Sequence, residues 1–135
     1  MPGVFDKLNL KEQREIVVLN APTSFDAELQ TLRKVKVVRT LGAVEKLTFA
    51  LVFATQKSQV DRLSKSLASK ASGDAILWFA YPKSTSQRFE CDFNRDNGWE
   101  VIREAGWDSV RQVAIDEDWS ALRFRRKEFI NRRSQ

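Results

Sequence analysis

Three runs of residues without a charged side chain constrain the fold of this chain more than any other feature. They cover residues 16–20 (IVVLN), 47–54 (LTFALVFA) and 75–81 (AILWFAY). Apolar residues at successive positions indicate a strand that is covered on both faces, whereas alternation would indicate one face in water. Such strands are typical of parallel sheets between helical layers. The sequence therefore predicts a central parallel sheet in an α/β domain.

The segments between these runs predict helices. Residues 56–71 place apolar side chains on one face of a helix and charged ones mostly off it. A second helix is expected over residues 23–33, with Thr23 and Asp26 as a capping pair. A third is expected over residues 94–105, with Gly106 as its C-cap.

Three further strands complete the predicted sheet. Residues 35–40 predict a less buried strand, and residues 109–116 and 120–126 predict an antiparallel pair. We expect a three-layer, Rossmann-like α/β sandwich. Its mostly parallel sheet has about six strands in the order 2-1-3-4-6-5 and ends in the antiparallel hairpin.

Length and charge divide the chain into a domain and a tail. The 135 residues suit one domain, predicted over residues 1–126 and followed by a basic tail at 127–135. Residues 123–135 hold six basic residues and one acidic residue, which accounts for the whole formal charge of +5. We expect no export signal, no membrane span and, with a single cysteine, a cytoplasmic location.

Several chemistries are excluded by the residues that are missing. The chain has no histidine and one cysteine, which removes histidine-based catalysis and zinc sites built from histidine or several cysteines. The five glycines are too far apart for a GxGxxG motif or a P-loop. The sequence assigns no cofactor, no metal site and no catalytic residue. Tight binding of S-adenosylmethionine or a nicotinamide dinucleotide is not expected.

Polar residues that follow the predicted strands are candidates for binding a small anion. In an open α/β sheet, ligands bind at the carboxyl ends of the strands, where helix N-termini favour negative charge. The alternative for the hydroxyl groups is helix capping, and for Lys83 a solvated polar loop. The candidate residues are Asn20, Thr23, Ser24, Thr55, Gln56, Lys57, Lys83, Ser84 and Ser86.

Two other features have a functional and a purely structural interpretation. Residues 116–118 (DED) offer oxygen ligands suited to magnesium, but acidic residues also favour turns, and we interpret them as a turn. In the tail, Lys127, Arg132 and Arg133 are candidates for contacting nucleic-acid phosphates. Alternatively the tail packs its phenylalanines and leaves its charges in solvent.

Three segments carry a resemblance to a known group of proteins. VVLNAP at residues 17–22, LWFAYPKSTS at 77–86 and VAIDEDWSALRF at 113–124 resemble the motifs of a small family of uncharacterised bacterial proteins. These motifs are an Asn-Ala-Pro turn, a Tyr-Pro-Lys strand end and an acidic-Trp-Ser hairpin. The resemblance implies a shared fold and no particular activity.

In outline the predicted layout also resembles a trimmed class I methyltransferase domain, which ends in a similar hairpin. Members of that class have a glycine-rich turn after the first strand, where this chain has Asn20, Ala21 and Pro22. They usually have an acidic residue at the end of the second strand, where this chain has Arg39 and Thr40. The resemblance therefore implies the fold and leaves the activity open.

Three hypotheses about function follow. The sequence favours a non-catalytic α/β domain that binds a small anionic ligand or a protein partner, and it disfavours an enzyme. One alternative is an enzyme that uses a nucleotide-like cofactor at the carboxyl edge of the sheet. The other is a nucleic-acid accessory protein that acts through its basic tail.

Overall fold

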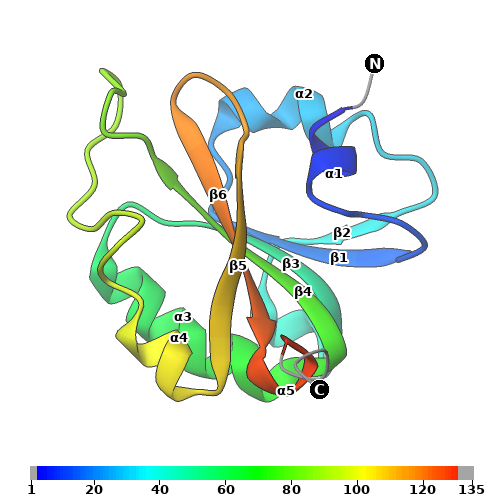
Figure 1. Ribbon diagram of the computed structural model, residues 1–135. Helices are drawn as coiled ribbons and strands as arrows, with labels where there is room; N and C mark the ends of the chain where they lie inside the picture. The colour runs from blue at the N-terminus through cyan, green and yellow to red at the C-terminus, as the bar shows by residue number, and fades with distance from the viewer. Residues whose placement is uncertain (1–2, 131–135) are drawn as a thin grey trace.

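The three apolar runs lie side by side at the centre of one six-stranded sheet. The computed structural model describes residues 3–130, and its strand order is β2-β1-β3-β4-β6-β5 (Figure 1). Pairs β1–β2, β1–β3 and β3–β4 are parallel, while β4–β6 and β5–β6 are antiparallel. The predicted fold, strand order and hairpin are confirmed. The strands are β1 (Glu15–Leu19), β2 (Lys36–Val38), β3 (Leu47–Phe53), β4 (Ala71–Pro82), β5 (Trp107–Ala114) and β6 (Trp119–Arg126).

Each face of the sheet is covered by its own apolar core. On one face, Phe25, Phe53 and Trp78 pack with α1 and α2. On the other, Val60 and Leu67 of α3 and residues of α4 pack on the sheet (Figure 1). The strands β1, β3 and β4 are buried almost throughout because they lie between these two layers. The helices are α1 (Val4–Lys7), η1 (Thr23–Phe25), α2 (Asp26–Leu29), η2 (Leu41–Ala43), α3 (Lys57–Lys70), α4 (Glu100–Glu104) and α5 (Lys127–Ile130).

Two predicted helices are shorter than the sequence indicated. The segment after β1 forms η1 and the single turn of α2, and no side chain caps it, so the predicted Thr23–Asp26 pair is wrong. The helix predicted over residues 94–105 is reduced to α4. The Asn94 carboxamide oxygen accepts the amides of Asp96 and Asn97 at 2.8 and 3.1 Å, which diverts the backbone into a turn. The C-cap of α4 is Ala105, one residue before the predicted Gly106, which follows it with a φ of +100°.

Within residues 3–130, no helix has the length and apolar character that crossing a membrane requires.

Candidate functional site

The carboxyl edge of the sheet holds a pocket of about 840 Å³, which we call the Tyr81 pocket. It lies between the end of β4, the following loop at residues 82–96, and the paired strands β5 and β6. Its volume is within the range typical of small-molecule sites. The lining residues are Tyr81, Pro82, Lys83, Ser84, Thr85, Ser86, Phe89, Glu90, Cys91, Phe93, Asn94, Arg95, Asp96, Gln112 and Ser120.

Of the predicted candidates, Lys83, Ser84 and Ser86 line this pocket, and the loops after β1 and β3 do not. Ser86 has a structural role, because its hydroxyl donates to Asp118 Oδ1 at 2.9 Å and accepts the amides of Arg88 and Phe89. The Lys83 amide donates to the Asp118 carbonyl at 2.8 Å. These bonds tie the loop to the turn of the β5–β6 hairpin. Among residues 3–130, the Lys83 ammonium group has no hydrogen bond or ion pair.

The acidic segment at residues 116–118 forms the hairpin turn. Asp116 Oδ1 accepts the amides of Asp118 and Trp119 at 2.8 and 2.9 Å. In the described part of the chain, no three histidine, cysteine, aspartate or glutamate side chains are grouped so that they could hold a metal ion.

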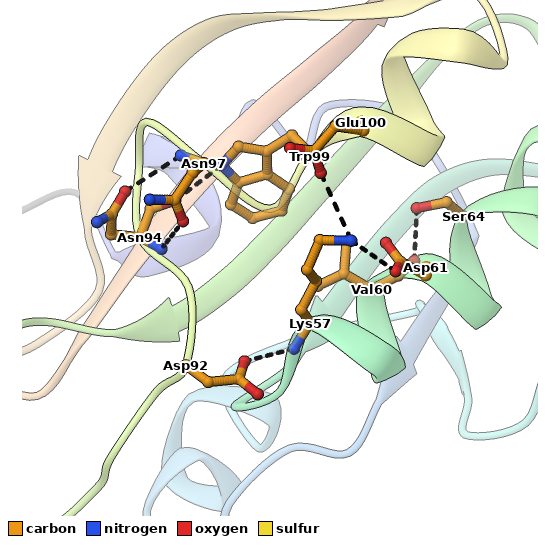
Figure 2. Close-up of polar contacts among 9 residues, drawn as sticks. All are labelled: Lys57, Val60, Asp61, Ser64, Asp92, Asn94, Asn97, Trp99 and Glu100. Carbon is orange, nitrogen blue, oxygen red and sulfur yellow. Dashed lines mark hydrogen bonds and ion pairs between the residues drawn. The ribbon is translucent and has the colours of Figure 1, made fainter.

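The amides that lead into α3 donate to side chains of the protein, and Figure 2 shows the one from Lys57. The amides of Thr55 and Gln56 donate to Gln59 Oε1 at 2.9 and 3.1 Å. The Lys57 amide donates to Asp92 Oδ1 at 2.6 Å, so a carboxylate of the chain already occupies the favourable end of the helix dipole.

The Lys57 side chain is also paired within the protein. Its ammonium group lies 2.8 Å from Asp61 Oδ2 and 3.5 Å from Glu100 Oε1 (Figure 2). The hydrogen bond to Asp61 is the main reason that the pKa of Lys57 is raised. Thr55, Gln56 and Lys57 therefore lie between β3 and the first turn of α3, as predicted. The amides of Thr55 and Gln56 donate within that turn, and the donors of Lys57 join α3 to Asp92 and to Glu100 of α4.

The loop after β1 makes a sharp turn without glycine. Asn20 has a φ of +60°, a left-handed conformation that asparagine adopts more readily than most residues. Asn20, Thr23 and Ser24 are exposed, while Phe25 is buried against Phe53 at the end of β3. The candidate side chains of this loop thus face solvent and lie outside the Tyr81 pocket.

The floor of the Tyr81 pocket carries a polar pair that no sequence motif indicated. Gln112 Nε2 donates to the Tyr81 hydroxyl oxygen at 2.7 Å. Burial raises the pKa of Tyr81, so the phenol stays protonated at neutral pH and can donate its hydrogen to a ligand. The two residues are 31 positions apart and meet only because β5 and β4 both pair with β6.

The charges of the pocket wall are mixed. Lys83 and Arg95 supply two cations, and Glu90 and Asp96 supply two anions. Cys91 also lines the pocket, and burial raises the pKa of its thiol, so it is not a thiolate nucleophile at neutral pH. The pocket can bind a dipolar ligand by hydrogen bonds and ion pairs, with Tyr81, Phe89 and Phe93 as apolar surfaces.

The tail candidates fall partly outside the described residues. Lys127 begins α5 and is exposed, and its amide donates to the Gly106 carbonyl at 2.9 Å. Arg132 and Arg133 lie outside the described residues, so the predicted contact with nucleic acid stays a prediction.

Comparisons with known proteins identify the fold. No protein-family model matches the chain, and no curated protein matches it. Among solved structures, it is similar to an S-adenosylmethionine (SAM)-dependent methyltransferase from Aquifex aeolicus, with a TM-score of 0.60, 12% identity, and coverage of 90% of this chain and 87% of that one.

Two further structures extend this similarity. The N-methyltransferase NodS from Bradyrhizobium japonicum has a TM-score of 0.53 and 12% identity, with coverage of 84% of this chain and 85% of that one. The Methanococcus jannaschii fibrillarin pre-rRNA processing protein has a TM-score of 0.55 and 11% identity, with coverage of 87% and 68%. At these identities, the comparison shows a shared methyltransferase-like, Rossmann-like fold.

This finding corrects one expectation from the sequence. The residues favoured a non-catalytic domain and disfavoured an enzyme. Two of these solved chains are methyltransferases by name, and the one from Aquifex aeolicus is named as SAM-dependent, so the fold is one that enzymes use.

The ends of β1 and β2 do not fit S-adenosylmethionine. The exposed Arg39 and Thr40 follow β2, and neither has a carboxylate. The acidic residue that is expected at this strand end to bind the ribose of S-adenosylmethionine is therefore missing. Before the first turn of α3, the Thr55 amide already donates to Gln59, and the Lys57 amide at the start of the helix donates to Asp92. The pocket at this edge lies farther along the sheet, over β4, β6 and β5.

Proposed function

We propose that this chain is an enzyme that binds a nucleotide-like cofactor in the Tyr81 pocket. The observation that carries the proposal is the position of the pocket. It opens at the carboxyl edge of the parallel strands, in a fold shared with SAM-dependent methyltransferases.

The lining of the pocket suits the parts of a nucleotide-like molecule. Aromatic side chains such as Phe89 and Phe93 offer surfaces for a base. The Tyr81 hydroxyl offers a hydrogen-bond donor, and Lys83 offers an ammonium group that no described residue neutralises. Tyr81 lies at the end of β4 and the other three residues lie on the loop that follows, which hydrogen bonds to Asp118 tie to the turn of the β5–β6 hairpin.

The test is calorimetric titration of the whole chain with S-adenosylhomocysteine and, separately, with adenosine monophosphate. At least one should bind, and Lys83→Gln should weaken that binding about tenfold, because a hydrogen bond to a charged group is lost. Lys65→Gln is the matched control, since Lys65 is exposed on α3 and outside the pocket.

Two results would contradict the proposal. The first is that neither compound binds the unaltered chain. The second is that Lys83→Gln binds as tightly as Lys65→Gln, which would place the ligand elsewhere.

A further inference from the structure

Three arginines share one face of the β5–β6 hairpin, which we call the arginine face: Arg111, Arg123 and Arg125. Because side chains alternate along a strand, Arg123 and Arg125 of β6 point away from the side on which Leu122 and Phe124 join the α3 core. Arg111 of β5 is the direct cross-strand partner of Arg123. Gln112 and Ser120, which line the Tyr81 pocket, belong to the opposite face.

A β-bulge places Arg111 opposite Arg123. The register shifts between Ser109 and Arg111, so Val110 is the extra residue and is 42% exposed. Without this shift, Val110 would stand opposite Arg123 and Arg111 would point to the other face. The bulge thus creates a contact between like charges, which is unfavourable across two strands.

The charge on the arginine face is only partly balanced. Arg125 donates through Nε and Nη2 to both carboxylate oxygens of Asp74, at 2.9 and 2.6 Å. Asp74 also attracts the Arg123 guanidinium, while Arg125 and Arg111 repel it. Within residues 3–130, Arg111 and Arg123 form no hydrogen bond or ion pair of their own.

Arg123 has a polar atom that lacks a partner. Its Nε is buried and has no hydrogen-bond acceptor among the described residues. Burial is the main cause that lowers the pKa of Arg123, although an arginine remains charged at neutral pH. Arg126, three residues further along β6, differs because its guanidinium donates to the carbonyls of Ala68, Ala71 and Gly73.

We propose that Arg111 and Arg123 form a binding site for a phosphate group on the arginine face. A phosphate between the two guanidinium groups supplies the acceptors that the protein lacks and removes their mutual repulsion. The planar fork of arginine matches phosphate oxygens in pairs. The site lies on the other face of the sheet from the Tyr81 pocket and does not depend on the function proposed for that pocket.

The test follows the arginine Nε–H signals of the whole chain by NMR during titration with inorganic phosphate and with a short single-stranded DNA oligonucleotide. Sodium chloride at matched ionic strength is the blank. We expect the Arg123 Nε–H signal to shift with a phosphate-bearing probe and not with chloride. Saturation by inorganic phosphate indicates a free phosphate group as the ligand, whereas saturation by the oligonucleotide alone indicates phosphodiesters.

Two variants distinguish binding at this site from non-specific electrostatic attraction to a basic protein. Arg111→Gln should weaken phosphate or oligonucleotide binding about tenfold, while Arg62→Gln, which removes an exposed charge from α3, should not. Arg111→Gln should also leave stability unchanged or raised, because it relieves repulsion at an exposed position. The proposal is overturned if neither probe moves the signal beyond the chloride blank, or if both variants bind alike. Calorimetry with S-adenosylhomocysteine, which carries no phosphate group, should be unaffected by Arg111→Gln.

Discussion

The first turn of α3 and the Tyr81 pocket lie at the same edge of the sheet and carry similar side chains, but only one has groups left for a ligand. At α3, three amides and the Lys57 ammonium group are bonded to Gln59, Asp92, Asp61 and Glu100. In the pocket, the Lys83 ammonium group has no described partner, and the Tyr81 hydroxyl has its proton free to donate.

A helix N-terminus with a nearby lysine is therefore not by itself an anion site. What decides is whether the chain supplies its own acceptor, and here Asp92 does so from 35 residues away. Arg126 and Arg123 differ in the same way: the Arg126 guanidinium donates to a backbone carbonyl, whereas Arg123 Nε has no acceptor among the described residues.

The largest effect is expected at Trp99, which holds the pocket floor and loop together. It is 1% exposed, so Trp99→Ala should lower the free energy of unfolding by about 3–5 kcal/mol, measured by urea denaturation. Its indole Nε1 also donates to the carbonyls of Asn94 and Arg95. Its ring contacts those of Phe79, Tyr81, Phe93 and Phe124.

Trp99→Phe keeps an aromatic ring but removes the indole Nε1 donor, so it should separate the effect of packing from the effect of these hydrogen bonds. We expect faster amide exchange at Asn97, in the pocket loop, and unchanged exchange at Lys57, whose amide is held by Asp92. Equal acceleration at both amides would show that the two regions open together, and the contrast between them would fail.

A smaller effect is expected at Gly98, which closes the turn between the pocket loop and α4. Its φ is +98°, and an added Cβ would stand 2.7 Å from Phe93 Cβ. Gly98→Ala should lower the free energy of unfolding by about 2 kcal/mol and displace the Phe93 wall of the pocket.

Gly42→Ala is the control for this substitution. No atom lies within 4 Å of its added Cβ, so thermal unfolding should show a change of no more than about 0.5 kcal/mol. Equal costs at Gly42 and Gly98 would contradict the assignment of strain to the pocket loop.

Much of the fold could be predicted because its signals are local. Runs of apolar residues such as 75–81 indicate strands covered on both faces, and the order of strands follows from short, right-handed connections. The predicted helix over 94–105 was too long because the Asn94 side chain competes for backbone amides, which an apolar pattern does not reveal.

The site was harder to predict because its parts meet through strand pairing. Lys83 was found from its place after a strand, but Gln112 reaches Tyr81 only in the register of the finished sheet. The arginine pair depends on the bulge at Val110, and a change of one residue in register exchanges the two faces of a strand. The sequence disfavoured an enzyme because the cofactor motifs are missing, but missing motifs do not define a fold, and a solved chain with this fold is named a SAM-dependent methyltransferase.

The smallest effect is expected for the ion pairs of Lys57. Its side chain is 43% exposed, so solvent screens its attraction to Asp61 and Glu100. The folded-state pKa of Lys57 is raised above its usual 10.5, chiefly by the hydrogen bond to Asp61. The stabilisation of the folded state by these ion pairs is therefore complete below pH 10.5, and it is lost as the pH rises through the higher, folded-state value.

Urea denaturation should show a difference in the free energy of unfolding between the unaltered chain and Lys57→Gln. This difference should be constant from neutral pH upward and should then shrink in alkali. Lys65→Gln, which removes an exposed lysine from the same helix, should show no such change. If the difference in the free energy of unfolding between the unaltered chain and Lys57→Gln is the same in strong alkali as at neutral pH, the charge of the Lys57 ammonium group does not hold α3 to α4. Ion pairing would then not be what distinguishes Lys57 from Lys83.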